Sequence, residues 1–299
     1  MRARTHSWVI LGCICLAMSA ASAQPSARQK SLYQSINWVA PPAVGQIGTV
    51  ATVRVPEGCT YTGRPGAATF LELTENPPDP SVAGVVLCNA ADTSAQTWFV
   101  LYSYEASGYV NDDEKNSLDA DKLLAAMREG TAQGNRMRIE KGWDTLSIES
   151  WITPPFYDVA TNNLTWALLV REPTGDASAN HSVRLLGRGG VISAELVVDA
   201  AHLDEVIPQL NALIAETNFS PGQKYSEWRQ GDKVAEYGLV ALVAGGAGAA
   251  AVKYGLFGKL FKLVAAFFVA AWKLIVAAAI GLSAWIKSLF RKKEKAADS

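Results

Sequence analysis

Short apolar runs alternate with polar residues over the first 236 positions of the chain, and the sequence after them is almost continuously apolar. From residue 47 onward the short runs are rich in β-branched and aromatic residues, and Gly, Pro or Asn residues separate them, which is the pattern of strands. The strands predicted in this way cover 47–55, 82–88, 97–104, 146–151, 164–171, 182–186 and 191–198.

Two helices interrupt these strands. Asp119 is a suitable N-cap for a helix that ends at Glu129, before Gly130. A second helix begins near Asp204, where apolar residues recur at intervals of three and four, and Pro208 requires it to start just before that residue or to bend there. The order of elements predicts an α+β domain with a mainly antiparallel sheet and packed helices, followed by a C-terminal transmembrane helical region.

The C-terminal region predicts an attachment to a lipid bilayer. Residues 263–286 are apolar except for Lys273, and 24 residues of helix are about 36 Å long, enough to cross the hydrocarbon core. One helical face carries the lysines, and this candidate membrane face consists of Lys259, Lys262, Lys273 and Lys287. The helix either spans the bilayer, with Lys273 snorkelling or facing a partner, or lies amphipathically among the headgroups. We favour one crossing, because the basic segment 291–299 then stays in the cytoplasm.

The N-terminal segment 1–23 has the features of a secretory signal. Arg2 and Arg4 precede an apolar run over 8–20, and Ala21-Ser22-Ala23 forms a cleavage site. The chain then divides into a signal peptide (1–23), a periplasmic ectodomain (24–236), a membrane-associated helical region (237–290) and a cytoplasmic basic tail (291–299). This division predicts a protein of the bacterial inner membrane.

Charge is unevenly distributed between these segments. Residues 24–236 hold 16 basic and 26 acidic side chains, whereas residues 237–299 hold 9 basic and 2 acidic ones. A nucleic-acid partner is disfavoured, since the phosphate-neutralising charge would have to lie on the folded part. Removal of the leader leaves Cys59 and Cys88, which an oxidising compartment allows to pair as a disulfide, although two buried thiols remain the alternative.

The sequence offers no recognisable catalytic, cofactor or metal site. The two histidines after the leader, His181 and His202, lie in no catalytic motif. The acidic run 111–114 either gathers oxygen ligands for Ca²⁺ or forms a solvated entry to the next helix, and it lacks the glycine and final glutamate of an EF-hand loop. The segment 187–190 lies between two predicted strands, which favours a glycine turn over a phosphate cradle.

Aromatic residues provide the candidate interaction site. Trp143, Trp151, Tyr157 and Trp166, with Arg188 as a reader of carboxylate or phosphate, offer rigid faces for a glycan or a peptide. The alternative is that a β-rich domain buries its aromatic residues in its core.

Several ordered motifs resemble a known family. They are Gly142-Trp143, Trp151-x-x-Pro154-Pro155-x-Tyr157-Asp158, Leu164-x-Trp166-Ala167, Leu185-Leu186-Gly187-Arg188-Gly189-Gly190, Gly222-x-x-Tyr225 and Gly231-Asp232-Lys233-Val234-Ala235-x-Tyr237-Gly238-Leu239. Over residues 30–260 the chain resembles the bacterial domain-of-unknown-function family 2167, described as predicted membrane-anchored proteins. The resemblance implies a secreted domain with a C-terminal membrane anchor, and no catalytic or cofactor-binding residue.

Three functions follow from the sequence. The first is a membrane-anchored periplasmic protein without enzymatic activity, which contacts an envelope protein or a cell-wall component. The second is an envelope hydrolase or transferase that acts through carboxylates in no known motif. The third is a self-associating membrane-remodelling or channel-like homo-oligomer, suggested by the lysine face and by small residues such as Gly245 and Ala249.

Overall fold

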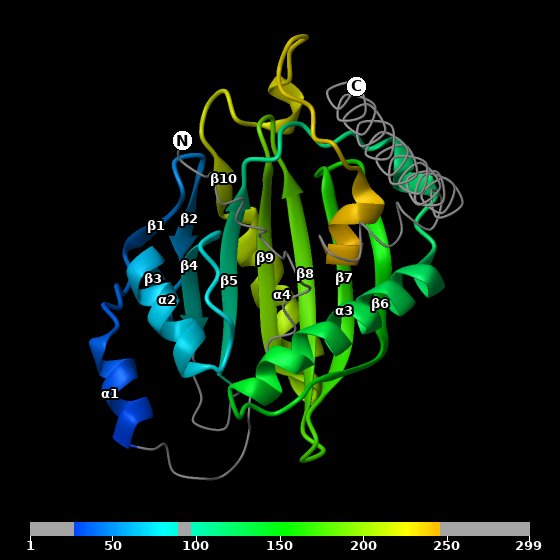
Figure 1. Cartoon of the computed structure of the whole chain (residues 1–299). Coiled ribbons are helices and arrows are strands. Elements are labelled where there is room, and N and C mark those ends of the chain that lie inside the picture. The colour runs from blue at the N-terminus through cyan, green and yellow to red at the C-terminus, as the bar shows by residue number, and fades with distance from the viewer. Residues whose placement is uncertain (1–26, 89–96, 246–299) are drawn as a thin grey trace, which may run out of the picture. The chain divides into compact units, whose positions relative to one another are not determined.

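A seven-stranded antiparallel sheet forms the centre of the domain (Figure 1). The computed structural model describes residues 27–88 and 97–245, all within a unit that covers Met1–Ala249. The predicted signal peptide, the basic tail, the lysine face and the membrane region beyond residue 245 lie outside the described residues. Among the described residues, no helix combines the length and the apolar composition needed to cross a bilayer.

The strand order in the large sheet is β3-β4-β5-β9-β8-β7-β6. These strands are β3 (Cys59–Gly63), β4 (Val82–Cys88), β5 (Trp98–Glu105), β6 (Ser147–Asp158), β7 (Asn163–Arg171), β8 (Ala177–Leu186) and β9 (Val191–Asp199). A smaller sheet has the order β1-β2-β10 and consists of β1 (Ala43–Ile47), β2 (Ala51–Val55) and β10 (Thr217–Phe219). All pairings in both sheets are antiparallel, so the α+β prediction is confirmed.

Helices cover both faces of the large sheet. They are α1 (Ala27–Ser35), α2 (Arg64–Leu73), α3 (Ala120–Glu140) and α4 (Leu203–Ala215), and short 3-10 turns are η1 (Asp113–Asn116), η2 (Ala200–His202) and η3 (Tyr225–Glu227). Figure 1 shows α2 and α3 in front of the sheet and α4 behind it. Two layers of apolar side chains result.

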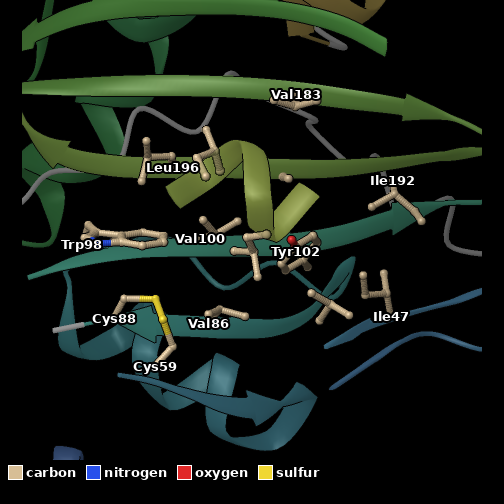
Figure 2. Close-up of a cluster of buried hydrophobic side chains, with 14 of the residues drawn as sticks. Ile47, Cys59, Val86, Cys88, Trp98, Val100, Tyr102, Val183, Ile192 and Leu196 are labelled. Carbon is tan, nitrogen blue, oxygen red and sulfur yellow. A yellow bond between two sulfur atoms is a disulfide. The ribbon is translucent and has the colours of Figure 1, made fainter. Parts of the chain in front are cut away.

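Strand β5 contributes alternate residues to the two layers, as a strand with a side-chain period of two must. Its side chains Trp98, Val100 and Tyr102 enter the layer shared with α4, whereas Phe99 and Leu101 pack with α2. Figure 2 shows the first of these layers, which also takes Ile47 from the small sheet.

A disulfide joins Cys59 to Cys88 at one end of the paired strands β3 and β4 (Figure 2). The two cysteines lie directly opposite each other in the register, and both are buried. In this structure the two cysteines are therefore bonded to each other and are not two buried thiols.

The structure departs from the predicted elements in several places, among them the longer strands β6 and β8. The single strand predicted over 47–55 is two strands, because Gly48 adopts a φ of +57° and turns the chain back on itself. The helix predicted to stop before Gly130 continues to Glu140, since Thr131 and Arg138, which follow the glycine, are also buried against the domain. The structure adds helix α2, whose Pro65 in the first turn suits a helix start rather than a turn alone.

Candidate functional site

The segment that leads from the folded domain toward the apolar C-terminal sequence is bonded to the domain. We call residues 220–238 the strap. The Tyr109 amide donates to the Lys233 carbonyl at 2.8 Å, and the Ala235 amide donates to the Tyr109 carbonyl at 2.8 Å. The strap therefore extends the hydrogen-bonding of the loop after β5.

An ion pair fixes the strap to the turn between β8 and β9. The Arg188 Nε lies 2.7 Å from Asp232 Oδ2 and its Nη2 lies 2.8 Å from Oδ1, a bidentate geometry. This guanidinium holds the pKa of Asp232 down at about 2. A side chain on Gly187 would lie 2.7 Å from the ring of Phe219, just before the strap, and 3.1 Å from the Gln223 carbonyl on the strap, so the glycine allows the strap to approach closely. Arg188 is thus engaged within the molecule.

Four aromatic side chains gather between the strap and the loops it crosses. The rings of Tyr109 and Tyr225 stack with centroids 4.4 Å apart, and Trp228 lies 5.2 Å from Tyr109. Burial and the charge of Asp112 raise the pKa of Tyr157, which also neighbours Tyr225, and burial and Tyr109 raise the pKa of Tyr225. We call Tyr109, Tyr157, Tyr225 and Trp228 the aromatic cluster.

Beyond the strap, residues 239–245 are helical and pack on the domain. The side chains of Leu239, Leu242 and Val243 are buried. The first turn is capped by Glu114, whose Oε2 accepts from the Val240 amide at 2.9 Å. A Cβ on Gly238 would lie 2.4 Å from that carboxylate oxygen, so only glycine leaves room for the cap.

A polar network lies on the face of the large sheet opposite α4. Arg184 forms an ion pair with Glu195, which also accepts from the Ser182 hydroxyl, and the guanidinium carbon of Arg184 lies 4.7 Å from the centre of the Trp166 ring. Because the side chains of Arg184 and Glu195 are only 15% and 17% exposed, their mutual pairing offsets the cost of removing both from water. The arrangement is that of a structural network.

A groove of about 780 Å³ lies at the start of the chain, between α1, α2 and the end of α3. Among its lining residues are Arg28, Glu72, Asn76, Lys141 and Trp143. Asn76 is buried, and its Oδ1 atom accepts no hydrogen bond from any of the described residues. The Lys141 ammonium lies 4.9 Å from the centre of the Trp143 ring. An aromatic face surrounded by charged and amide groups suits a polar ligand.

The five predicted interaction residues do not form one cluster. Trp143 lines the groove, whereas Tyr157 and Arg188 lie at the strap. Trp151 packs beside α3, with its indole nitrogen donating to the Ala120 carbonyl at 3.0 Å, and Trp166 is buried under Arg184.

The structure also shows the surroundings of His181 and of the acidic run 111–114. His181 is buried in β8, and burial lowers its pKa to about 4. The run 111–114 enters η1, where Asp112 pairs with Lys115 at 3.0 Å and Glu114 caps the later helix. Within the described ranges, no three His, Cys, Asp or Glu residues are grouped as they would be around a metal ion.

Sequence reasoning missed Glu114 and Tyr109 as functional residues. Their partners lie more than a hundred positions away in the chain, and no local pattern connects them. The glycine motifs 187–190 and 231–239 were the available signal, because each contains a glycine that a distant group approaches closely.

Comparison with known proteins places the chain in a family. No curated protein matches it. Among solved structures, it is similar to the cyanobacterial PsbP (CyanoP) of Synechocystis sp. PCC 6803, with 14% sequence identity and a TM-score of 0.33 over 62% of this chain and 93% of that one. The family "Protein of unknown function (DUF2167)" matches residues 42–281. The chain belongs to this family.

Proposed function

We propose that this protein is an exported, membrane-anchored protein of the bacterial envelope, whose periplasmic domain binds an envelope component. The observation that carries the proposal is the docked strap. Residues 220–245 are hydrogen-bonded, ion-paired or buried on the domain, directly before the apolar C-terminal sequence. The domain would therefore be held at the membrane surface rather than tethered by a long linker.

Two further observations support the location. A disulfide between Cys59 and Cys88 is typical of a compartment outside the cytosol. The apolar sequence after residue 245 is accompanied by basic residues, and residues 291–295 read RKKEK, which favours retention of that end in the cytoplasm. The leader over 1–23 supplies the export signal that both require.

Cell fractionation tests the anchoring. The full chain should remain in membranes after a carbonate wash, whereas a chain that ends at Gly245 should appear in the soluble periplasmic fraction. A control chain that ends at Lys295 keeps the apolar sequence and should behave as the full chain does. Protease added to spheroplasts should digest the domain. If the chain ending at Gly245 stayed in washed membranes as completely as the full chain, the anchoring proposal would be lost.

The Trp143 groove favours a cell-wall component as the bound partner. Saccharides are held by an aromatic face together with charged and amide groups. The groove supplies Trp143 with Asn76, Lys141 and the Arg28–Glu72 ion pair. The groove volume lies within the range of ligand sites. By comparison, the described residues offer no observation that favours the hydrolase or the self-associating assembly.

Binding to purified cell-wall sacculi tests this role. We expect Trp143→Ala to reduce co-sedimentation of the full chain with sacculi, because the stacking face is lost. Trp228→Ala, which removes a tryptophan at the other end of the domain, is the matched control and should bind as the wild type does. Equal binding by all three proteins would exclude the groove as the contact site.

A further inference from the structure

We propose that the end of the domain that carries the strap rests in the lipid headgroup region, with Trp228 and its apolar neighbours in contact with lipid. The inference deepens the proposed function and rests on its membrane anchor. It adds a second, peripheral contact with the bilayer and thereby an orientation of the whole domain.

Large apolar side chains are exposed at this end. Trp228 is 40% exposed and Val234 is 50% exposed, both on the strap, and Val159 in the turn after β6 is 66% exposed. They belong to one end of the domain, because Val234 bridges to Tyr109, Tyr109 contacts Trp228, and Val159 follows the strand that holds Tyr157. Exposed apolar residues that gather in this way mark a contact surface.

The chemistry of the aromatic cluster selects lipid as the occupant. Tryptophan and tyrosine combine an apolar ring with a polar atom, and they concentrate where hydrocarbon meets the headgroups. Trp228 contacts the ring of Tyr109, which itself stacks on Tyr225, and the Tyr225 hydroxyl donates to the Val110 carbonyl at 2.9 Å. Because these side chains are already held in place, they would lose little conformational entropy on entering the lipid headgroup region.

Two of the acidic groups at this end form ion pairs within the domain. The carboxylate of Asp232 is paired with Arg188, and that of Asp112 is paired with Lys115. Two acidic groups that would otherwise repel an anionic lipid surface are thus neutralised from within the domain.

The position of the chain end points to the same surface. Residues 246–299 continue from the helical turns 239–245, whose Val240 amide is bonded to Glu114. Seven helical residues extend about 10 Å. Gly245 therefore lies about 10–20 Å from η1. Asp112, the residue before η1, lies beside Tyr157.

The same geometry places the Trp143 groove away from the membrane. Trp143 precedes the start of β6, whereas Tyr157 lies near its end, and a strand of 12 residues extends on the order of 30 Å once its bulges are allowed for. Trp143 and Trp228 are therefore probes of opposite ends of one rigid sheet.

Site-directed fluorescence in vesicles tests the orientation. The full chain, with Cys13 and Cys15 replaced by serine, receives one new cysteine through Trp228→Cys, Val234→Cys or Trp143→Cys. Each variant is labelled with an environment-sensitive nitrobenzoxadiazole probe and reconstituted into phosphatidylethanolamine and phosphatidylglycerol vesicles. Vesicle flotation measures anchoring, and lipids with a nitroxide near the headgroup measure contact. Circular dichroism confirms that each variant is folded, and positions 228 and 234 provide two independent probes of the strap.

The outcomes separate the inference from the proposed function. We expect loss of emission at positions 228 and 234 on addition of nitroxide lipid, with emission at position 143 unchanged. If the chain floats with vesicles but neither strap probe is quenched, the inference is wrong and the anchor stands. Equal quenching at position 143 would also overturn the orientation. If the chain does not float, both the anchor and the inference fail.

Discussion

Removal of the disulfide gives the best-defined change in stability. The bridge closes a segment with a sequence separation of 29, and the loop-closure entropy for that length corresponds to about 3.6 kcal/mol at 25 °C. This is a large fraction of the stability of an ordinary domain, about 5–15 kcal/mol. We therefore expect the double variant Cys59→Ala/Cys88→Ala to unfold at a markedly lower urea concentration than the wild type.

Tryptophan fluorescence is the appropriate assay, because Trp98 lies opposite Cys88 in the register of β4 and β5 and is buried. Unfolding of the full chain in urea is followed with and without a reducing agent. The reducing agent should destabilise the wild type, because unfolding exposes the disulfide to reduction. It should leave the stability of the double variant unchanged. In protein that keeps residues 1–23, Cys13→Ser/Cys15→Ser is the control and should match the wild type. A loss below about 1 kcal/mol in the double variant would refute the entropic reasoning.

Three further predictions concern the cap, a buried histidine and a packed glycine. Glu114→Ala removes a charge-assisted cap, so it should destabilise the helical turns 239–245 by about 1–2 kcal/mol and speed their amide hydrogen exchange roughly tenfold. Unchanged exchange would contradict the docking of these turns on the domain. Burial lowers the pKa of His181 to about 4, from 6.5 in the unfolded chain. Between these pH values the unfolded state binds more protons than the folded state. The free energy of unfolding should therefore fall by up to about 3 kcal/mol as the pH drops from 6.5 to 4. In denaturation series at several pH values, His181→Phe should flatten that dependence, and an unchanged slope would exclude the histidine as its source. Gly84→Ala should cost about 1–3 kcal/mol in urea unfolding, because its Cβ would lie 2.6 Å from the Tyr61 ring; wild-type stability would show that the ring can move aside.

The sheet was largely predictable from local pattern. Strands 82–88 and 191–198 were identified by their β-branched residues between turn residues, and the structure places β4 and β9 at nearly those positions. These central strands are buried on both faces, so their apolar, β-branched composition alone predicts that they are strands. The local sequence predicts element boundaries less well at glycine, because glycine occurs both in turns and inside helices. Gly48 turns the chain after β1, whereas Gly130 is tolerated inside α3, where the buried residues before and after it, Met127 and Thr131, keep the helix packed on the domain.

The candidate site was less predictable because long-range contacts create it. The strap has no apolar period, and its position depends on partners such as Tyr109 and Glu114 that lie far away in the chain. Arg188 was identified as a reader of carboxylates, and the carboxylate it binds is Asp232 of the same chain. The sequence names Trp143 as a candidate interaction residue, but its groove needs α1 and α2, which approach it only in the folded domain.

The central claim is that no free linker separates the domain from the C-terminal sequence, and a distance measurement in the membrane tests it most directly. Spin labels at the exposed positions Glu129 on α3 and Gln230 on the strap report that distance by double electron–electron resonance in the full chain in lipid discs. A docked strap predicts one narrow distance distribution, the same in detergent and in lipid. A free segment over 220–245 would have an end-to-end distance of about 25–30 Å with a spread of similar size. A broad distribution of that kind would contradict the account.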